Sequence, residues 1–241
     1  MAFSSDTVIN SIGGPIELRE VALLFEFDPD GSLPVFGWDG SRIVVVNITA
    51  CRPVGSLQLF DVLIDSGDSI KASARTKFVR RDGSSVAPIG LNSNESLLPL
   101  YTKVDHHGYT LYKHLSTHYR SAPAPADRSL WRKVSRLIAE WKLGESLLPG
   151  TYVEHIDGDR SNAMPSNIRI DHRPDQAKRS SCYGIVDAVN AGQAIIREFN
   201  DRKSPDNHKV ECVEAMSPSA AIEIFVDSHD TIAVSGVFIQ L

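Results

Sequence analysis

Residues 151–180 read TYVEHIDGDRSNAMPSNIRIDHRPDQAKRS, and this stretch decides the fold and the chemistry expected of the middle of the chain. Residues Tyr152–Ile156 have the composition of a β-strand, and Asp157-Gly158-Asp159 is a turn signal. Residues Asn167–Ile170 predict a second strand, and Pro174 suits the first turn of a short helix. The pattern therefore predicts two strands followed by a helix.

Four polar side chains would converge in such a unit: Glu154, His155, Asn167 and Gln176. Hydrolysis of a phosphodiester needs a base that activates water and a cation that offsets charge on the phosphate. A neutral imidazole has a pKa near the working pH, so His155 suits the first task. The side-chain oxygens of Glu154 and Gln176 are hard ligands of the kind that Mg²⁺ or Mn²⁺ prefers.

This stretch resembles the HNH endonucleases, whose signature runs approximately HHiDGnr.NNrpeNL…N, and its spacing is kept here. The resemblance implies that His155 is the general base and that Asn167 holds it in orientation. It also implies that Glu154 and Gln176 ligate the metal, at positions where relatives usually carry His or Asp and Asn or His. Ala163 replaces a usual Asn. The alternative reading is a Gly-Asp turn between two strands, with His155 facing solvent.

The middle of the chain is basic, although the formal net charge of the whole is −5. Residues 103–181 hold 13 Lys+Arg against 9 Asp+Glu, so the remainder is acidic. Within this segment, Leu130–Trp141 has apolar residues at helical spacing, which predicts an amphipathic helix that ends at Gly144. We expect this segment to bind double-stranded DNA. The predicted DNA-binding residues are Arg132, Lys133, Arg136, Arg160 and Arg169. The alternative for the helix is that its basic face is exposed to solvent and does not bind DNA.

The flanks of this segment are predicted to be β-rich. Short runs such as Ile43–Ile48 and Thr231–Leu241 are rich in Val, Ile, Leu and Phe, and Gly-containing turn signals separate them. The apolar run Val21–Phe25 is also of strand length. The Pro/Ala-rich stretch Ser121–Asp127 predicts a linker. One β-domain with a second domain inserted into it fits this order.

The flanks are similar to inteins. The resemblance lies in FSSDTVI at residues 3–9, in residues 62–101 and in the closing residues 207–241. It implies a Hint fold, but the splicing residues have been replaced. The nucleophile position is Ala2, the first catalytic His is Thr76, and the closing His-Asn pair is Gln240-Leu241. Because Ala offers no nucleophile for an acyl shift, protein splicing is not expected.

The expected fold class is a mainly β Hint (Hedgehog/intein-like) domain with an inserted α+β HNH (ββα-metal) module. Residues 1–102 and 182–241 would form the Hint-like domain, and residues 103–181 the module. The expected function is an HNH-type homing DNA endonuclease on a splicing-inactive scaffold, and the resemblance to inteins implies a flanking extein host protein as a partner. The alternatives are a catalytically weakened DNA-binding remnant and a splice-blocked mutant of an active intein. No oligomeric state is indicated.

The chain has no signal-like start and no apolar run of the roughly 18 residues that a membrane span needs. Its three Cys are widely spaced, which argues against a disulfide framework and against a CxxC zinc site. These features predict no membrane partner and a cytoplasmic location, in a protein of phage or bacterial origin.

Overall fold

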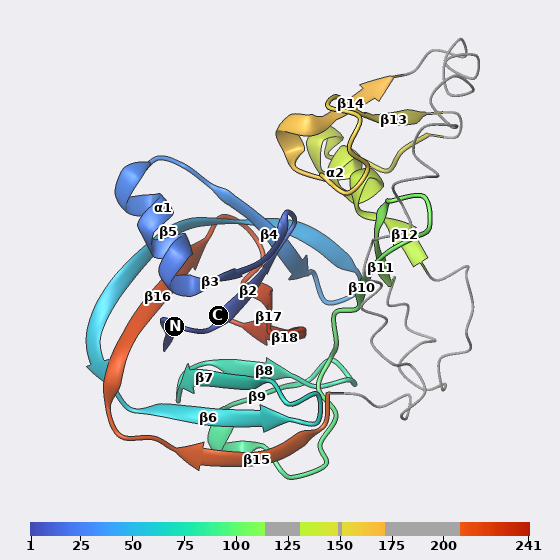
Figure 1. The fold of residues 1–241 in the computed structure, drawn as a ribbon. Helices are drawn as coiled ribbons and strands as arrows, with labels where there is room; N and C mark the ends of the chain where they lie inside the picture. Colours follow the sequence, from blue (N-terminus) through green and yellow to red (C-terminus); the bar gives the residue numbers. More distant parts are fainter. Residues whose placement is uncertain (114–130, 149–150, 172–207) are drawn as a thin grey trace. The chain divides into compact units, whose positions relative to one another are not determined.

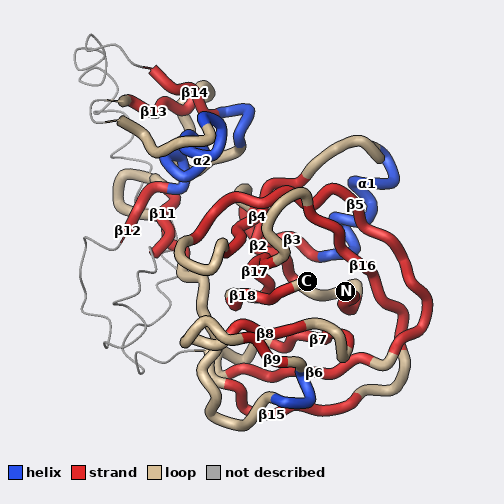
Figure 2. Tube along the Cα trace, turned by 180° about the vertical axis from the view of Figure 1, so that it is seen from behind, coloured by secondary structure: helices blue, strands red, loops and turns tan. Residues whose placement is uncertain are grey.

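A computed structural model describes residues 1–113, 131–148, 151–171 and 208–241 (Figures 1 and 2). These residues form two compact units, and each is described by itself. The first unit contains residues 1–100 and 208–241, and the second contains residues 101–113, 131–148 and 151–171. The predicted linker at Ser121–Asp127, the predicted helix around Pro174 and the side chain of Gln176 lie outside the described residues.

The first unit is mainly β: a curled, antiparallel sheet of thirteen described strands (Figure 1). Along the sheet the order is β15-β6-β7-β1-β16-β5-β4-β2-β17-β18-β8-β9, and β3 pairs with β2. The strands are β1 (Ala2–Ser4), β2 (Val8–Ser11), β3 (Gly14–Glu17), β4 (Leu33–Trp38), β5 (Ile43–Leu57), β6 (Leu59–Ile64), β7 (Ser69–Ser73), β8 (Lys77–Val79), β9 (Ser85–Val86), β15 (Val210–Ala215), β16 (Ser219–Val226), β17 (Thr231–Val234) and β18 (Val237–Gln240). The prediction of β-rich flanks is therefore confirmed for most of their length.

The first and last strands lie inside this sheet. Strand β1 pairs with both β7 and β16, whereas β18 pairs with β17 and β8. Figures 1 and 2 both show the two chain ends close together within the unit. The core that the sheet encloses includes the fully buried Phe3, Ile9 and Phe78. Burial of this apolar surface is the main source of stability for such a sheet.

Helix α1 (Leu18–Phe27) corrects the expectation of β-structure around Val21–Phe25. Leu18 and Val21, three residues apart, are both buried, and Phe25 packs partly against the same core. This spacing puts the three side chains on one face of a helix. The other face of this helix is apolar as well, and this hides the helical period in the sequence.

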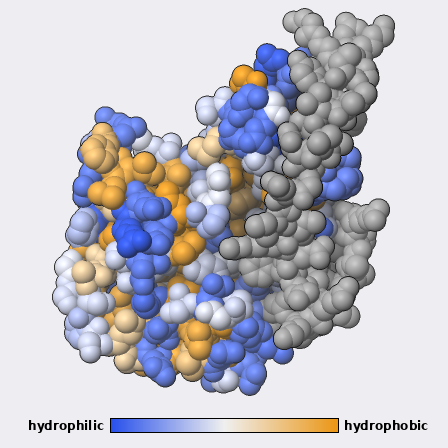
Figure 3. Space-filling model, in the orientation of Figure 1, coloured by the Kyte–Doolittle hydropathy of each residue, from blue (hydrophilic) through white to orange (hydrophobic). Residues whose placement is uncertain are grey.

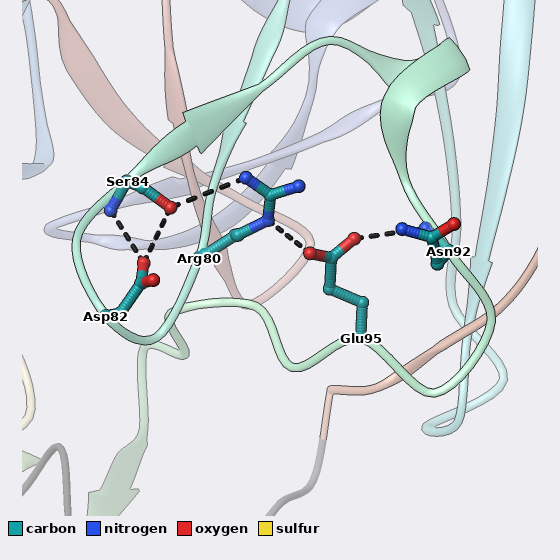
Figure 4. Close-up of polar contacts among 5 residues, drawn as sticks. All are labelled: Arg80, Asp82, Ser84, Asn92 and Glu95. Carbon is teal, nitrogen blue, oxygen red and sulfur yellow. Dashed lines mark hydrogen bonds and ion pairs between the residues drawn. The ribbon is translucent and has the colours of Figure 1, made fainter.

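An ion pair braces the turn between β8 and β9 (Figure 4). The Arg80 guanidinium donates to a Glu95 carboxylate oxygen, and the other Glu95 oxygen accepts the Asn92 N–H at 3.0 Å. The turn itself closes through Asp82 Oδ1, which accepts the Ser84 N–H at 2.8 Å and the Ser84 hydroxyl at 2.7 Å. A short 3₁₀ helix, η1 (Pro88–Gly90), follows this hairpin.

The second unit contains a three-stranded sheet, a two-stranded sheet and one helix among its described residues. Its elements are β10 (Thr102–Val104), β11 (Thr110–Lys113), β12 (Trp131–Lys133), α2 (Val134–Leu143), β13 (Tyr152–His155), the 3₁₀ helix η4 (Pro165–Asn167) and β14 (Ile168–Asp171). None of the helices in the described ranges has the length and apolar character needed to span a bilayer.

Helix α2 begins later than the predicted start at Leu130. Residues Trp131–Lys133 form strand β12, which pairs antiparallel with β11, and the helix begins at Val134. Pairing with a distant strand has overridden the local helical pattern. The predicted end is confirmed, since Gly144 caps the helix in the left-handed conformation at φ 71°. Arg132 and Lys133 therefore project from a strand, and Arg136 alone of the three lies on the helix.

Candidate functional site

Residues 151–171 fold as a β-hairpin, which confirms the two predicted strands. Strands β13 and β14 pair antiparallel, with Glu154 opposite Arg169 and His155 opposite Ile168. Gly158 adopts a φ of +80° in the predicted turn, a conformation that glycine takes without strain. Helix α2 is fastened to this hairpin by Lys142, whose Nζ donates to the carbonyl oxygens of Pro165 and Ile168, each at 2.8 Å.

His155 ends β13 and is 8% exposed. Its Nε2 is buried and has no hydrogen-bond partner among the described residues. Burial lowers the pKa of the imidazole below its ordinary value, and nearby Lys133 and Arg160 lower it further, whereas Asp157 opposes them. The structure thus places a buried imidazole here, with an Nε2 that no described residue contacts by a hydrogen bond, and not the solvent-facing His of the alternative reading.

Asn167 braces the loop that follows His155. Its Nδ2 donates to Asp157 Oδ1 and to the Asn162 carbonyl, both at 2.8 Å, and its Oδ1 accepts the Asp157 N–H at 2.9 Å. Asn162 Nδ2 donates to the second Asp157 oxygen at 2.7 Å. Desolvation would raise the pKa of Asp157, but the hydrogen bonds from Asn167 and Asn162 outweigh it and lower that pKa. Asn167 therefore acts on the loop after the base, and Asp157 is a site residue that the sequence analysis treated only as a turn.

Ala163 is 1% exposed in this loop, at the position where the related motif has a second Asn. Its methyl group adds no polar atom to the braced loop. In the described loop the amide side chains that brace it are therefore those of Asn162 and Asn167, together with the carboxylates of Asp157 and Asp159.

Tyr109 is a second residue that the sequence analysis missed. Its ring lies 5.8 Å from the His155 ring, centroid to centroid. Lys133 Nζ lies 3.2 Å from the Tyr109 centroid, and Arg160 Cζ lies 5.1 Å from it. Arg160 also donates through Nη1 to the His107 carbonyl at 3.3 Å. The aromatic ring therefore gathers two cations beside the candidate base.

Three of the five predicted DNA-binding residues are not among the cations at the Tyr109 ring. Arg132 and Arg136 are exposed, on β12 and α2. Arg169 donates to Glu154 through Nε at 3.1 Å and also through Nη2. The structure brings Lys133 and Arg160 together near His155 and keeps Arg169 on a carboxylate.

The described residues do not by themselves fit a divalent metal ion. Glu154 offers hard oxygen ligands, but the Arg169 guanidinium already engages one of them, Oε2. In the described part of the chain no three His, Cys, Asp or Glu side chains cluster as a metal site. His106 and His107 stack at 3.7 Å between ring centroids, and both are exposed in the β10–β11 turn. The second expected ligand, Gln176, lies outside the described residues, so the metal site stays a prediction.

In the first unit, the replaced splicing positions lie near one another. The buried Ala2 N–H donates to Ser73 Oγ at 3.3 Å, and Ser73 Oγ lies 3.1 Å from Thr76 Oγ1. Thr76 is fully buried, and the next residue, Lys77, pairs with Gln240 across β8 and β18. Hydrogen bonds and strand pairing therefore connect the first strand, Thr76 and the last strand.

No family model matches the sequence, and no curated protein matches it either. Solved structures of inteins are similar to it in fold. The DnaB intein from Synechocystis sp. PCC 6803 matches with a TM-score of 0.47 and 8% identity, over 99% of this chain and 96% of that chain. The DnaX mini intein from Spirulina platensis matches with a TM-score of 0.47 and 7% identity, over 100% of both chains.

The bacterial intein-like domain from Clostridium thermocellum matches with a TM-score of 0.46 and 11% identity, over 100% of this chain and 98% of that chain. The structural neighbours are thus inteins and an intein-like domain, and the curled, mainly β sheet resembles their Hint fold. The HNH module and its activity stay predictions.

Proposed function

We propose that this chain is an HNH-type homing DNA endonuclease carried on a splicing-inactive, intein-like scaffold. The observation that supports this most is the buried Nε2 of His155, which has no described partner and lies beside Lys133 and Arg160. A neutral imidazole in this setting is fitted to take a proton from water. The two cations are fitted to hold the phosphate that the water attacks.

In this proposal each group has one task. His155 accepts the proton of the attacking water at Nε2. Lys133 and Arg160 bind the phosphate, and Tyr109 keeps the two cations beside the base. Asn167 and Asp157 fix the loop that carries Arg160. The reaction is phosphodiester hydrolysis, one strand at a time.

The proposed cofactor is Mg²⁺ or Mn²⁺, which would supply charge stabilisation at the phosphate when bound. Glu154 and Gln176 are its proposed ligands. Since Arg169 engages Oε2 of Glu154, this ion pair competes with a metal for that oxygen. Metal dependence is therefore measured separately from the role of His155.

The test is nicking of supercoiled plasmid DNA in Mg²⁺ or Mn²⁺. Because a homing enzyme needs its own target, the plasmid carries an insert-free copy of the host locus or a randomised library. We expect His155→Ala to abolish nicking and to leave DNA binding at low salt largely intact. The matched control is His106→Ala, an exposed His of the same unit, which should nick like the unchanged protein. Full activity of His155→Ala would remove the base from this proposal.

A DNA-binding remnant is the second candidate function, and the Glu154–Arg169 ion pair favours it. In that case DNA is bound at low salt but not cut with any divalent metal. A splice-blocked intein is the third candidate, favoured by the proximity of Ala2, Thr76 and Gln240. Expression between flanking sequences distinguishes it, because only this candidate regains ligation when the replaced residues are restored.

A further inference from the structure

Helix α1 of the first unit is apolar on two faces. Leu18 and Val21 are buried against the sheet, but Leu23 and Leu24 are each 50% exposed and Phe27 is 88% exposed. Residues 23, 24 and 27 share one face of the helix, because they are three and four residues apart. Figure 3 shows the corresponding hydrophobic surface in orange over the position of α1. We call these three residues the outer stripe.

An outer stripe of this kind is unusual for a surface helix. A helix that borders solvent normally carries polar residues on its outer face, and one that is apolar all round is normally covered. Scattered exposed apolar residues need no partner, but three neighbours on one face mark an interaction site. The outer stripe is thus the strongest candidate surface for a contact in the first unit.

The surroundings of the outer stripe are acidic. Exposed carboxylates lie on both sides of it along the chain, at Glu20, Glu26, Asp28 and Asp30. The sequence from Glu20 to Gly40 has no Lys or Arg. The nearest cation in the sequence, Arg19, is engaged with Glu17 at 2.7 Å. The surface therefore combines an apolar centre with a negatively charged rim.

We propose that the outer stripe and its acidic rim bind a basic amphipathic helix of a partner protein. Apolar side chains of the partner at helical spacing would cover Leu23, Leu24 and Phe27, and its Lys or Arg side chains would face the carboxylates. The negative charge of the acidic rim argues against two other partners for this surface, a second copy of the chain and an anionic membrane. A symmetric contact between two copies would bring the same carboxylates together, and an anionic membrane surface would repel them.

The test uses the full chain and two synthetic helical peptides of about 14 residues, or four turns. Both carry Leu at positions i, i+3, i+4 and i+7; the remaining positions are mainly Lys in one peptide and Glu in the other. Fluorescence anisotropy measures binding of each peptide. We expect the Lys peptide to bind at least about tenfold more tightly than the Glu peptide, and its affinity to fall as salt rises.

Two variants connect binding to this surface. Leu23→Gln with Phe27→Gln keeps helix-forming residues while removing the apolar centre, and we expect it to lose the Lys peptide. Val54→Thr removes an apolar side chain that is 36% exposed on β5, away from α1 in the sequence, and should bind as before. Circular dichroism checks that each variant is folded.

Three results would overturn the proposal. The first is equal binding of both peptides, which would mean unspecific apolar contact. The second is unchanged Lys-peptide binding by the folded double variant. The third is sedimentation of the unchanged protein as a dimer that the double variant abolishes, which would make a second copy the occupant.

Discussion

Asn167 holds Asp157 from both sides: it donates to Asp157 Oδ1 at 2.8 Å and accepts the Asp157 N–H at 2.9 Å. Because Asp157 follows the candidate base by two residues, this pair sets the path of the chain as it leaves β13. An amide suits this role, since its NH₂ group can donate to two acceptors while its oxygen accepts. The HNH resemblance implies that Asn167 orients His155. In this structure Asn167 instead positions the loop that follows His155.

We expect Asn167→Ala to destabilise the second unit by about 1–3 kcal/mol, because it removes three part-buried hydrogen bonds to Asp157 and Asn162. Nicking should fall as the loop loosens. Urea denaturation and exchange of the Asp157 amide hydrogen measure the two effects. Ser166→Ala, at an exposed neighbouring position, is the control and should change neither. An unchanged exchange rate at Asp157 would contradict this role for Asn167.

The pH dependence follows from the lowered pKa of His155. In the proposed mechanism nicking needs the neutral imidazole, so its rate should rise with pH and have its midpoint below about pH 6.5, the ordinary pKa of His. The free energy of unfolding should also rise with pH in this range. Below about pH 6.5 the unfolded chain takes up a proton that the buried ring resists, so acid destabilises the fold. Rates of the first turnover between pH 5 and 8 test this, and a midpoint above that of free His would contradict it.

We expect Lys133→Met to weaken DNA binding and to change the pH dependence of nicking. Loss of one phosphate contact weakens binding to all sequences and lowers the salt slope of log K by about 1. Loss of a nearby cation also raises the pKa of His155, so the acid limb of the rate moves to higher pH. Salt titrations of binding and pH profiles at saturating DNA separate the effects. Arg52→Ala, an exposed cation of the first unit, is the control.

Local signals explain what could be predicted from the sequence. Strands β13 and β14 follow from composition, and their turn follows from Asp157-Gly158. The first turn of the predicted helix was wrong because pairing of Trp131–Lys133 with β11 is a contact between distant segments. Tyr109 was missed for the same reason, since only folding brings its ring to His155.

The ion pair between Arg80 and Glu95 provides a stability test for the first unit. Both side chains are mostly buried, at 27% and 18% exposed, and the carboxylate also accepts the Asn92 N–H. Glu95→Ala removes the acceptor of the Arg80 Nε–H and of this N–H and leaves the guanidinium only the Ser84 hydroxyl at 3.5 Å among its partners drawn in Figure 4, so we expect a loss of about 1.5–3 kcal/mol. Urea denaturation followed by circular dichroism measures it. Glu211→Ala removes an exposed carboxylate from β15 and should cost far less.

The replaced splicing positions lead to a final expected outcome. The resemblance to inteins assigns the nucleophile position to Ala2, whose N–H donates to Ser73 Oγ and whose methyl side chain cannot form an ester or thioester. At the other end Leu241 has no amide that could cyclise. We therefore expect the chain, expressed between two flanking protein sequences, to remain one polypeptide of full mass. Mass spectrometry and gel mobility check this, and a shorter product that joins the two flanks would show that other residues carry the splicing chemistry.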